Sequence, residues 1–233
     1  MTNDKKPEPM DIGPDFRPHV ELYRDAQSQL ESVRTDLVNQ ISSNIELKDF
    51  IHTIKSRIKS EKSLIDKLMR KFTQTGTMVQ TERLFLDVND IIGLRILHLH
   101  RAQIEELNAG ILKWIAGYNY EKLEGPIAKV FDVETQKFFE DRGIATEQNE
   151  RMYTSVHYVV LNSLHSPYSF EIQVRTLLEE EWGEIDHKIN YPTPTDSIAC
   201  SGQLRVLAHM TTGCNRLVDS ILLSHKDHIG KTA

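Results

Sequence analysis

The sequence predicts an α+β protein in which a mixed β-sheet of about five strands is flanked by helices. In the first half of the chain, segments with a helical apolar period alternate with segments that have a strand period. In the second half, two strand-like segments follow each other directly. Since the first pattern favours parallel pairing and the second favours a hairpin, we expect both kinds of pairing in one sheet. The 233 residues suit one domain with helical additions.

The first third of the chain predicts a helix, a strand and a second helix. Residues 17–48 carry apolar side chains at intervals of three and four, which predicts one long N-terminal helix. Residues 50–58 alternate apolar and polar side chains and predict a strand. Ser60 is suited to cap a helix over residues 61–71, and the polar residues 73–81 predict a loop.

The rest of the chain predicts the main part of the sheet and three more helices. Residues 91–99 predict a buried strand, and residues 102–116 predict an amphipathic helix that ends near Gly117. Short alternating segments predict further strands at residues 119–123, 144–147, 155–162 and 168–174. Residues 176–190 predict a helix that Pro192 halts. The last predicted helix covers residues 198–223, within a C-terminal helical segment 198–225.

Composition and charge place the protein among soluble, cytoplasmic proteins. Hydrophobic residues make up 39% of the chain, and no apolar run approaches the roughly 20 residues that cross a bilayer. The lead-in, residues 1–16, has no apolar signal segment and is rich in Pro, Asp and Lys, which predicts disorder. Cys200 and Cys214 are therefore expected to be free thiols. The net charge of −6 disfavours generic nucleic-acid binding, although residues 55–71 are basic.

Two acidic positions about eighty residues apart are candidate metal ligands. Asp90 precedes the apolar strand in DVNDIIGLRIL, and Glu171 lies in FEIQVRT. Carboxylates near strand ends commonly hold Mg²⁺ against the phosphates of a nucleotide. Arg95 and Arg175 end the same two segments and could bind phosphate. A turn aspartate and a solvent-exposed strand face are the ordinary alternatives for the two acids.

Two strand faces and one basic segment complete the candidate site. Glu171, Gln173 and Arg175 share one face of their strand. Tyr153, Ser155 and His157 share another, which is suited to a nucleobase and its ribose or phosphates. A Ser–His hydrolase pair is disfavoured, because no GxSxG elbow surrounds the serine and two residues on one strand are poorly placed for a triad.

The basic segment has both a functional and an ordinary interpretation. Arg57 and Lys59 lead into a helix N-terminus, where phosphate is favoured, whereas Arg70 and Lys71 are interpreted as solvated. No Walker glycine loop is present, which excludes a P-loop. In the later helix, the spacing of Trp182, His187 and Tyr191 is interpreted as packing.

Together these segments resemble the synthetase domain of the RelA/SpoT family, which makes the alarmone (p)ppGpp, and above all its short single-domain members. The resemblance spans residues 50–191 and rests on SRIKSEKSLIDKL, DIIGLRI, YTSVHYVV and FEIQVRT followed by WGEIDHKINY, in the family's order. It implies a nucleotidyltransferase-like synthetase fold. It also implies Mg²⁺-dependent transfer of pyrophosphate from ATP to the 3′-hydroxyl of GDP or GTP.

The resemblance assigns one group of residues to ATP and the metal ion. Asp90 and Glu171 would hold Mg²⁺, and Glu171 would help to deprotonate the attacking hydroxyl. Arg57 would stack on adenine. Three further residues would lie near the ATP phosphates: Lys59, Ser63 and Lys67.

A second group of residues is assigned to the acceptor. Tyr153 would stack on its base, and His157 and Gln173 would contact its phosphates or sugar. Arg95 and Arg175 match arginines of the family, for which a phosphate-binding role and a structural role both fit.

One departure from the family pattern leaves the acceptor open. Family members commonly have a lysine and then Asn-Gly or a similar pair before the acceptor tyrosine, whereas this chain reads TEQNERMY, with Arg151 and Met152. The alternatives are a toxin-type enzyme that modifies adenosine nucleotides or the 3′ end of tRNA, and a non-catalytic nucleotide-binding module. The acidic residues 146–150 disfavour tRNA. The apolar faces of the outer helices, residues 17–48 and 198–223, suit packing on the sheet or on a second subunit in a homo-oligomer.

Overall fold

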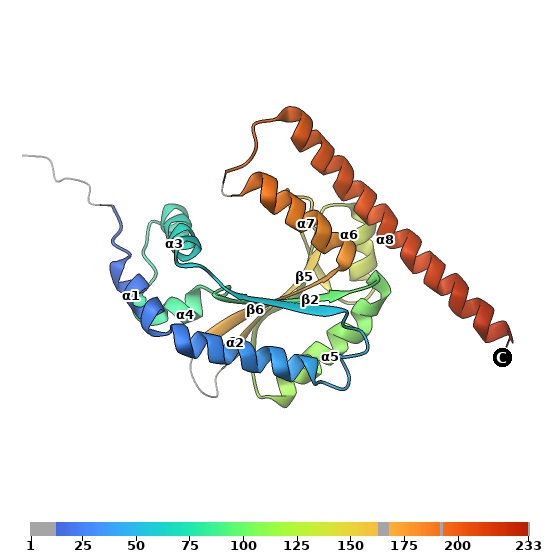
Figure 1. Ribbon diagram of the computed structural model, residues 1–233, viewed down its shortest axis with the longest axis horizontal. Coiled ribbons are helices and arrows are strands. Elements are labelled where there is room, and N and C mark those ends of the chain that lie inside the picture. The colour runs from blue at the N-terminus through green and yellow to red at the C-terminus, as the bar shows by residue number, and fades with distance from the viewer. Residues whose placement is uncertain (1–12, 163–167, 192, 233) are drawn as a thin grey trace, which may run out of the picture.

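The protein is built around a six-stranded mixed sheet with the strand order β1-β2-β6-β5-β3-β4 (Figure 1). The computed structural model describes residues 13–162, 168–191 and 193–232. The strands are β1 Thr53–Ile58, β2 Ile92–His98, β3 Glu121–Val130, β4 Ala145–Gln148, β5 Ser155–Asn162 and β6 Tyr168–Thr176. β2 pairs with β6 and β3 with β4 in parallel, and the other neighbours are antiparallel. The predicted α+β fold with a mixed sheet is confirmed, with one strand more than the expected number.

Helices lie on both faces of the sheet. They are α1 Arg17–Asp25, α2 Gln27–Ser42, α3 Glu61–Thr75, α4 Leu84–Asp87, α5 Ile104–Gly117, α6 Val133–Glu140, α7 Leu177–Asn190 and α8 Ile198–Thr232, with 3-10 turns η1 Thr81–Arg83 and η2 Arg101–Gln103. Figure 1 shows α2 and α5 along one face, α3 and α7 standing on the other, and α8 running past α7. Among the described residues, no helix combines the length and the apolar content needed to cross a bilayer.

The alternation of side chains along the central strands separates a core face from a polar face. The core side chains of β5 and β6 are fully buried: Val156, Tyr158, Val160, Phe170, Ile172 and Val174. Tyr158 donates from its hydroxyl to Asn108 Oδ1 of α5 at 2.8 Å, and Trp114 of α5 packs edge-on against Phe170. Because neighbouring residues in a strand point to opposite faces, the intervening polar residues point away from α5 and toward α7.

The single N-terminal helix predicted over residues 17–48 is wrong, because the structure has two helices there and the second ends earlier. Helix α1 ends at Asp25 and α2 begins at Gln27, and no contact of Ala26 explains the break. Helix α2 ends at Ser42 because Asn44 forms a turn, in which its Oδ1 accepts the backbone N–H of Glu46 at 2.9 Å. The predicted lead-in lies mostly outside the described residues, as does Pro192.

Three other segments are longer than predicted, and two α-helices, α4 and α6, were not predicted. Helix α3 continues to Thr75, where Gly76 with φ 70° provides a left-handed C-cap, so that the predicted loop begins later. Strand β3 continues beyond residue 123 through a register shift near Gly125. Helix α6 was not predicted, although Asp132 caps it by accepting the Thr135 N–H at 2.9 Å. Helix α8 extends to Thr232.

Candidate active site

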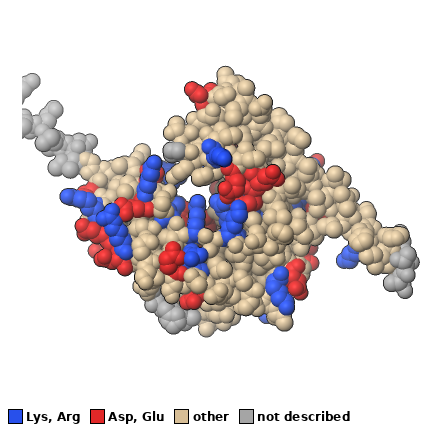
Figure 2. All heavy atoms as spheres, viewed as in Figure 1, with Lys and Arg blue, Asp and Glu red and all other residues tan. Residues whose placement is uncertain are grey.

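A row of polar side chains crosses four strands on the polar face of the sheet. In the strand register, Lys55 of β1 lies opposite Arg95 of β2, Arg95 lies opposite Gln173 of β6, and Gln173 lies opposite His157 of β5. The strand register therefore brings side chains that are far apart in the sequence onto one surface. Figure 2 shows Lys and Arg side chains gathered around a hollow in this region of the molecule.

A second row contains a glycine between two predicted site residues. Arg57 is paired with Gly93, and Gly93 with Glu171. A Cβ on Gly93 would lie 3.8 Å from Arg57 Cγ, so a side chain there would project between Arg57 and Glu171. Glycine at this position leaves space on the sheet floor.

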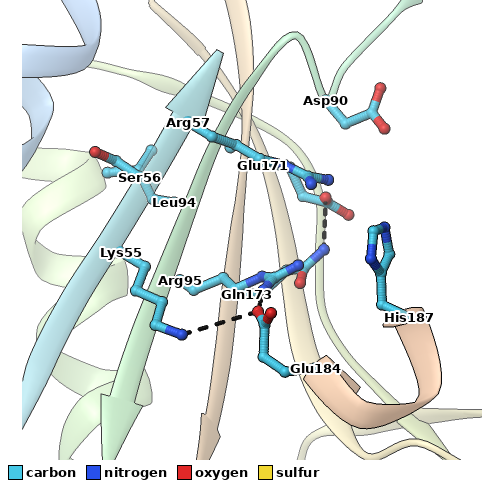
Figure 3. A pocket seen from close by; sticks show the side chains of 11 residues that line it. Lys55, Ser56, Arg57, Asp90, Leu94, Arg95, Glu171, Gln173, Glu184 and His187 are labelled. Atoms are coloured by element: carbon cyan, nitrogen blue, oxygen red, sulfur yellow. Dashed lines mark hydrogen bonds and ion pairs between the residues drawn. The ribbon is translucent and has the colours of Figure 1, made fainter. Parts of the chain in front are cut away.

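That space belongs to a cavity of about 230 Å³ between β1 and α7 (Figure 3). The cavity brings together five of the predicted site residues: Arg57, Asp90, Arg95, Glu171 and Gln173. Figure 3 shows His187 of α7 facing these residues from the opposite wall. Among the described residues, the Arg57 side chain makes no hydrogen bond or ion pair. Its guanidinium is therefore available to a ligand.

Asp90 is held at the rim of this cavity by two lysines. Lys59 Nζ lies 2.9 Å from Asp90 Oδ2, and Lys67 Nζ of α3 lies 3.4 Å from Asp90 Oδ1. The Lys59 backbone is itself fixed, since its N–H donates to Ile91 O at 2.8 Å and its carbonyl accepts the hydroxyl of Tyr23. Lys59 and Lys67 line neither described cavity, but they place two positive charges beside this carboxylate.

Glu171 is ionised and held by hydrogen bonds on both oxygens. Oε1 lies 2.9 Å from His157 Nδ1, and Oε2 accepts Gln173 Nε2 at 2.8 Å. Burial acts to raise the pKa of Glu171, but the bonds to His157 and Gln173 and the charge of Lys67 outweigh it and lower this pKa to about 2. Since Lys67 acts on both acids, Asp90 and Glu171 share one electrostatic environment.

Two predicted arginines are engaged by acidic residues of α7. Arg95 Nη1 lies 3.1 Å from Glu180 Oε1 and 2.8 Å from Glu184 Oε1, while Arg175 Nη1 lies 3.4 Å from Glu180 Oε2. Lys55 also pairs with Glu180, at 2.8 Å. Because the Glu180 side chain is only 5% exposed, these pairs fix the positions of the arginines more firmly than surface pairs would.

Arg175 passes directly over a glycine of α7. A Cβ on Gly183 would lie 2.9 Å from Arg175 Nη1, closer than the two atoms can approach without movement. Arg175 also donates from Nη2 to Gln173 Oε1. Gly183 therefore allows the guanidinium to lie between the sheet and α7, in line with Gln173 and Glu171.

A larger cavity of about 870 Å³ adjoins the first and contains the predicted acceptor residues. Tyr153, His157, Gln173 and Arg175 line it, and the rings of Tyr153 and His157 are 6.1 Å apart. His157 Nε2 is buried and has no hydrogen-bond partner among the described residues. Ser155 is 1% exposed and donates to Val174 O at 3.4 Å, so it is not available as a nucleophile.

The turn before Tyr153 holds Met152 in a left-handed conformation. The Asn149 side chain donates to Tyr153 O at 2.6 Å and accepts the Tyr153 N–H at 3.2 Å, which closes the turn. Met152 has φ 61°, a region that disfavours residues with a Cβ. Met152 and Arg151 both line the larger cavity.

Several lining residues were missed or were assigned to other roles. His187 was interpreted as packing but lines both cavities, and its ring stacks on Tyr191 at 4.6 Å. The Tyr191 hydroxyl lies 3.1 Å from Ser63 Oγ, which connects α7 to α3. Arg70 was interpreted as solvated but lines the larger cavity. Trp182 does pack, since it is 5% exposed and donates to Leu204 O at 3.0 Å.

The two predicted acids suit a divalent ion that also binds substrate phosphates. Asp90 Oδ1 is buried without a hydrogen-bond partner among the described residues, although Lys67 pairs with it. No group of three or more His, Cys, Asp or Glu in the described part of the chain forms a complete metal cage. Mg²⁺ in nucleotide enzymes typically uses one or two carboxylates and completes its shell with phosphate and water. The residues present fit that pattern.

Comparison with known proteins agrees with this geometry. Residues 56–196 match the model of the region found in RelA / SpoT proteins. The chain is 28% identical over 185 residues to the GTP pyrophosphokinase YwaC of Bacillus subtilis (strain 168), covering 78% of each chain.

Solved structures show the same fold. Small alarmone synthetase 1 from Bacillus subtilis, bound to its product pppGpp, is similar with a TM-score of 0.57 and 19% identity, over 90% of this chain and 95% of that one. A GTP pyrophosphokinase family protein from Streptococcus pneumoniae has a TM-score of 0.61 and 16% identity, over 90% and 97% of the two chains.

Proposed function

The chain belongs to the RelA/SpoT family, and from this premise we propose that it transfers pyrophosphate from ATP to the 3′-hydroxyl of GDP or GTP, making (p)ppGpp. The observation that carries the proposal is the meeting of Asp90, Glu171 and Arg57 in one cavity that adjoins a second, tyrosine-lined cavity. Transfer of a phosphoryl-type group requires two aligned substrates and neutralised charge rather than a protein nucleophile. Two adjoining cavities with cations between them meet these requirements.

The donor nucleotide is assigned to the wall formed by β1 and α3. The unpaired guanidinium of Arg57 is suited to stack on the adenine, because a planar cation binds well over an aromatic face. Lys59 and Lys67 reach the rim of the same cavity through Asp90 and supply charge for the ATP phosphates. Ser63 lies in the first turn of α3, beside Tyr191.

The acceptor nucleotide is assigned to the larger cavity. Tyr153 offers its ring to the base, and His157 and Gln173 lie on the sheet floor toward Glu171. Arg95 and Arg175 are already paired with acids of α7, so we assign them a structural role in the floor between the two nucleotides. With the two nucleotides assigned in this way, the acceptor sugar would lie near the group to be transferred.

Asp90 and Glu171 would hold Mg²⁺, which when bound neutralises charge on the phosphate oxygens. The low pKa of Glu171 keeps its carboxylate ionised, as metal ligation requires. The same low pKa makes Glu171 a weak acceptor for the proton of a sugar hydroxyl. We therefore assign Glu171 to ion binding and to the positioning of His157 and Gln173.

The proposal is tested by incubating the protein and Mg²⁺ with ATP labelled on the γ-phosphate and with GDP, GTP, ADP or tRNA as acceptor. We expect label to move to GDP or GTP, and Glu171→Gln to abolish transfer while circular dichroism shows that the variant still folds. Glu105→Gln, on the opposite side of the sheet in α5, is the control that removes one negative charge. Absence of product with every acceptor would refute the proposal. Label on tRNA alone would show that tRNA, and not GDP or GTP, is the acceptor.

A further inference from the structure

Helix α8 forms one wall of the larger cavity, although it follows the segment that matches the family model. Ser201, Leu204 and Arg205 of α8 line this cavity together with Arg151 and Tyr153. None of the three α8 residues lines the smaller cavity. The C-terminal helix therefore contributes to the acceptor side of the site and not to the donor side.

Arg205 projects from a part of α8 that is fixed to the body of the protein. Trp182 of α7 donates from Nε1 to Leu204 O at 3.0 Å, and Leu204 and Ala208 are buried. Further along α8, the side-chain amide of Asn215 donates to Glu179 Oε1 of α7 at 3.1 Å. These contacts fix the part of the α8 backbone from which the exposed Arg205 side chain extends at the cavity wall.

The arginines that line the larger cavity differ in their partners. Arg95 and Arg175 are neutralised by acids of α7, whereas Arg70, Arg151 and Arg205 make no ion pair or hydrogen bond among the described residues. Three acids also line the cavity: Asp66, Glu150 and Asp186. A bound anion is therefore favoured on the side of the cavity where the unpaired guanidinium groups lie.

We propose that Arg205 binds the 5′-phosphate chain of the acceptor nucleotide while Tyr153 holds its base. A guanidinium forms paired, charge-assisted hydrogen bonds with phosphate oxygens, and its planar fork is already organised for them. The assignment to the acceptor follows from the cavity that Arg205 lines, which contains Tyr153 and His157. It rests on the proposed function, because it assumes that a guanosine 5′-di- or triphosphate enters that cavity.

The test is steady-state kinetics of Arg205→Gln with GTP and ATP varied in turn. We expect KM for GTP to rise roughly tenfold, because one hydrogen bond to a charged group is lost. We expect kcat at saturating GTP and KM for ATP to remain unchanged. Arg205→Lys keeps the charge without the planar fork and should restore part of the affinity.

Lys226→Gln is the matched control, because this substitution removes the same charge from an exposed position on the same helix, about 30 Å further along. It should leave both KM values unchanged. A wild-type KM for GTP in Arg205→Gln, or a rise in KM for ATP instead, would overturn the inference while the proposed function stands. If wild-type protein makes no product and binds no GTP by calorimetry, the proposed function itself fails.

Discussion

Replacing Glu179 should change the way in which stability depends on pH. Glu179 lies at the start of α7, where its carboxylate accepts the backbone N–H of Thr176 at 2.8 Å and the side-chain amide of Asn215 at 3.1 Å. Burial raises the pKa of Glu179 to about 7 from its ordinary value of 4.5, against the opposing effects of the Thr176 N–H and of Arg175. The folded protein therefore keeps a proton that the unfolded chain releases.

The size and sign of the effect follow from this difference in pKa. Below pH 4.5 both states are protonated, and between pH 4.5 and 7 only the folded state is, so its stability falls as pH rises. A difference of about 2.5 units corresponds to about 3 kcal/mol of unfolding free energy lost by pH 8. Glu179→Gln cannot ionise and should not show this loss. Its remaining oxygen can accept the Thr176 N–H, and its amide nitrogen can donate to Asn215 Oδ1 once the Asn215 amide group turns over, since Oδ1 lacks a partner among the described residues.

The assay is urea denaturation of wild type and Glu179→Gln at pH 5 and pH 8. Other groups titrate in both proteins, so the informative quantity is the difference in unfolding free energy between them. We expect this difference to shift by about 2.5 kcal/mol toward the variant between the two pH values, because part of the loss has already occurred at pH 5. Glu181→Gln, at the exposed neighbouring position, should show no such shift. A difference that stays constant with pH would show that Glu179 is ionised throughout, and the reasoning from burial would be wrong.

Three further predictions concern the site. Gly183→Ala should lower transfer activity because it displaces Arg175, yet it should not destabilise the protein, since alanine favours a helix by about 1 kcal/mol relative to glycine. The control Gly213→Ala, whose added methyl group meets no neighbouring atom, should leave activity intact, and equal activity of the two variants would contradict the steric argument. Met152→Gly should be more stable than Met152→Ala by about 1 kcal/mol in urea denaturation, because only glycine adopts φ 61° without strain; equal stabilities would count against this conformation. The stabilising contribution of the ionised Glu171 is present above pH 4.5 and is lost as pH falls toward 2, so acid should reduce the stability of wild type more than that of Glu171→Gln, as followed by circular dichroism.

Most of the sheet could be predicted because its central strands alternate cleanly. The period of two in β6 placed Glu171, Gln173 and Arg175 on one face of that strand, and the period in β5 placed Ser155 and His157 on one face of the other. That the two faces coincide follows only from the strand register. The helix over α7 follows from Thr176 and Glu179, which form a capping box at its start.

The missing parts of the prediction have identifiable causes. The Gly125–Pro126 pair is typical of a turn, yet β3 continues through it with a register shift. Helix α6, which follows β3, was not predicted either. Whether Asp90 and Glu171 share a cavity depends on the parallel pairing of β2 and β6, a long-range contact that no local pattern encodes. The role of α8 was also hidden, because Arg205 is one exposed arginine on an amphipathic helix and only the packing of Trp182 on Leu204 brings it to the cavity.

The parallel pairing of β2 with β6 also determines when the protein becomes competent. These neighbours are separated by the whole segment that contains α5, β3, α6, β4 and β5. A growing polypeptide therefore cannot assemble the smaller cavity, which His187 of α7 also lines, until residue 187 has left the ribosome. If β6 then aligned one position out of step, Glu171 would turn into the apolar interior and Ile172 would take its place. A chain with this misalignment should therefore be inactive, because the carboxylate is missing from the polar face.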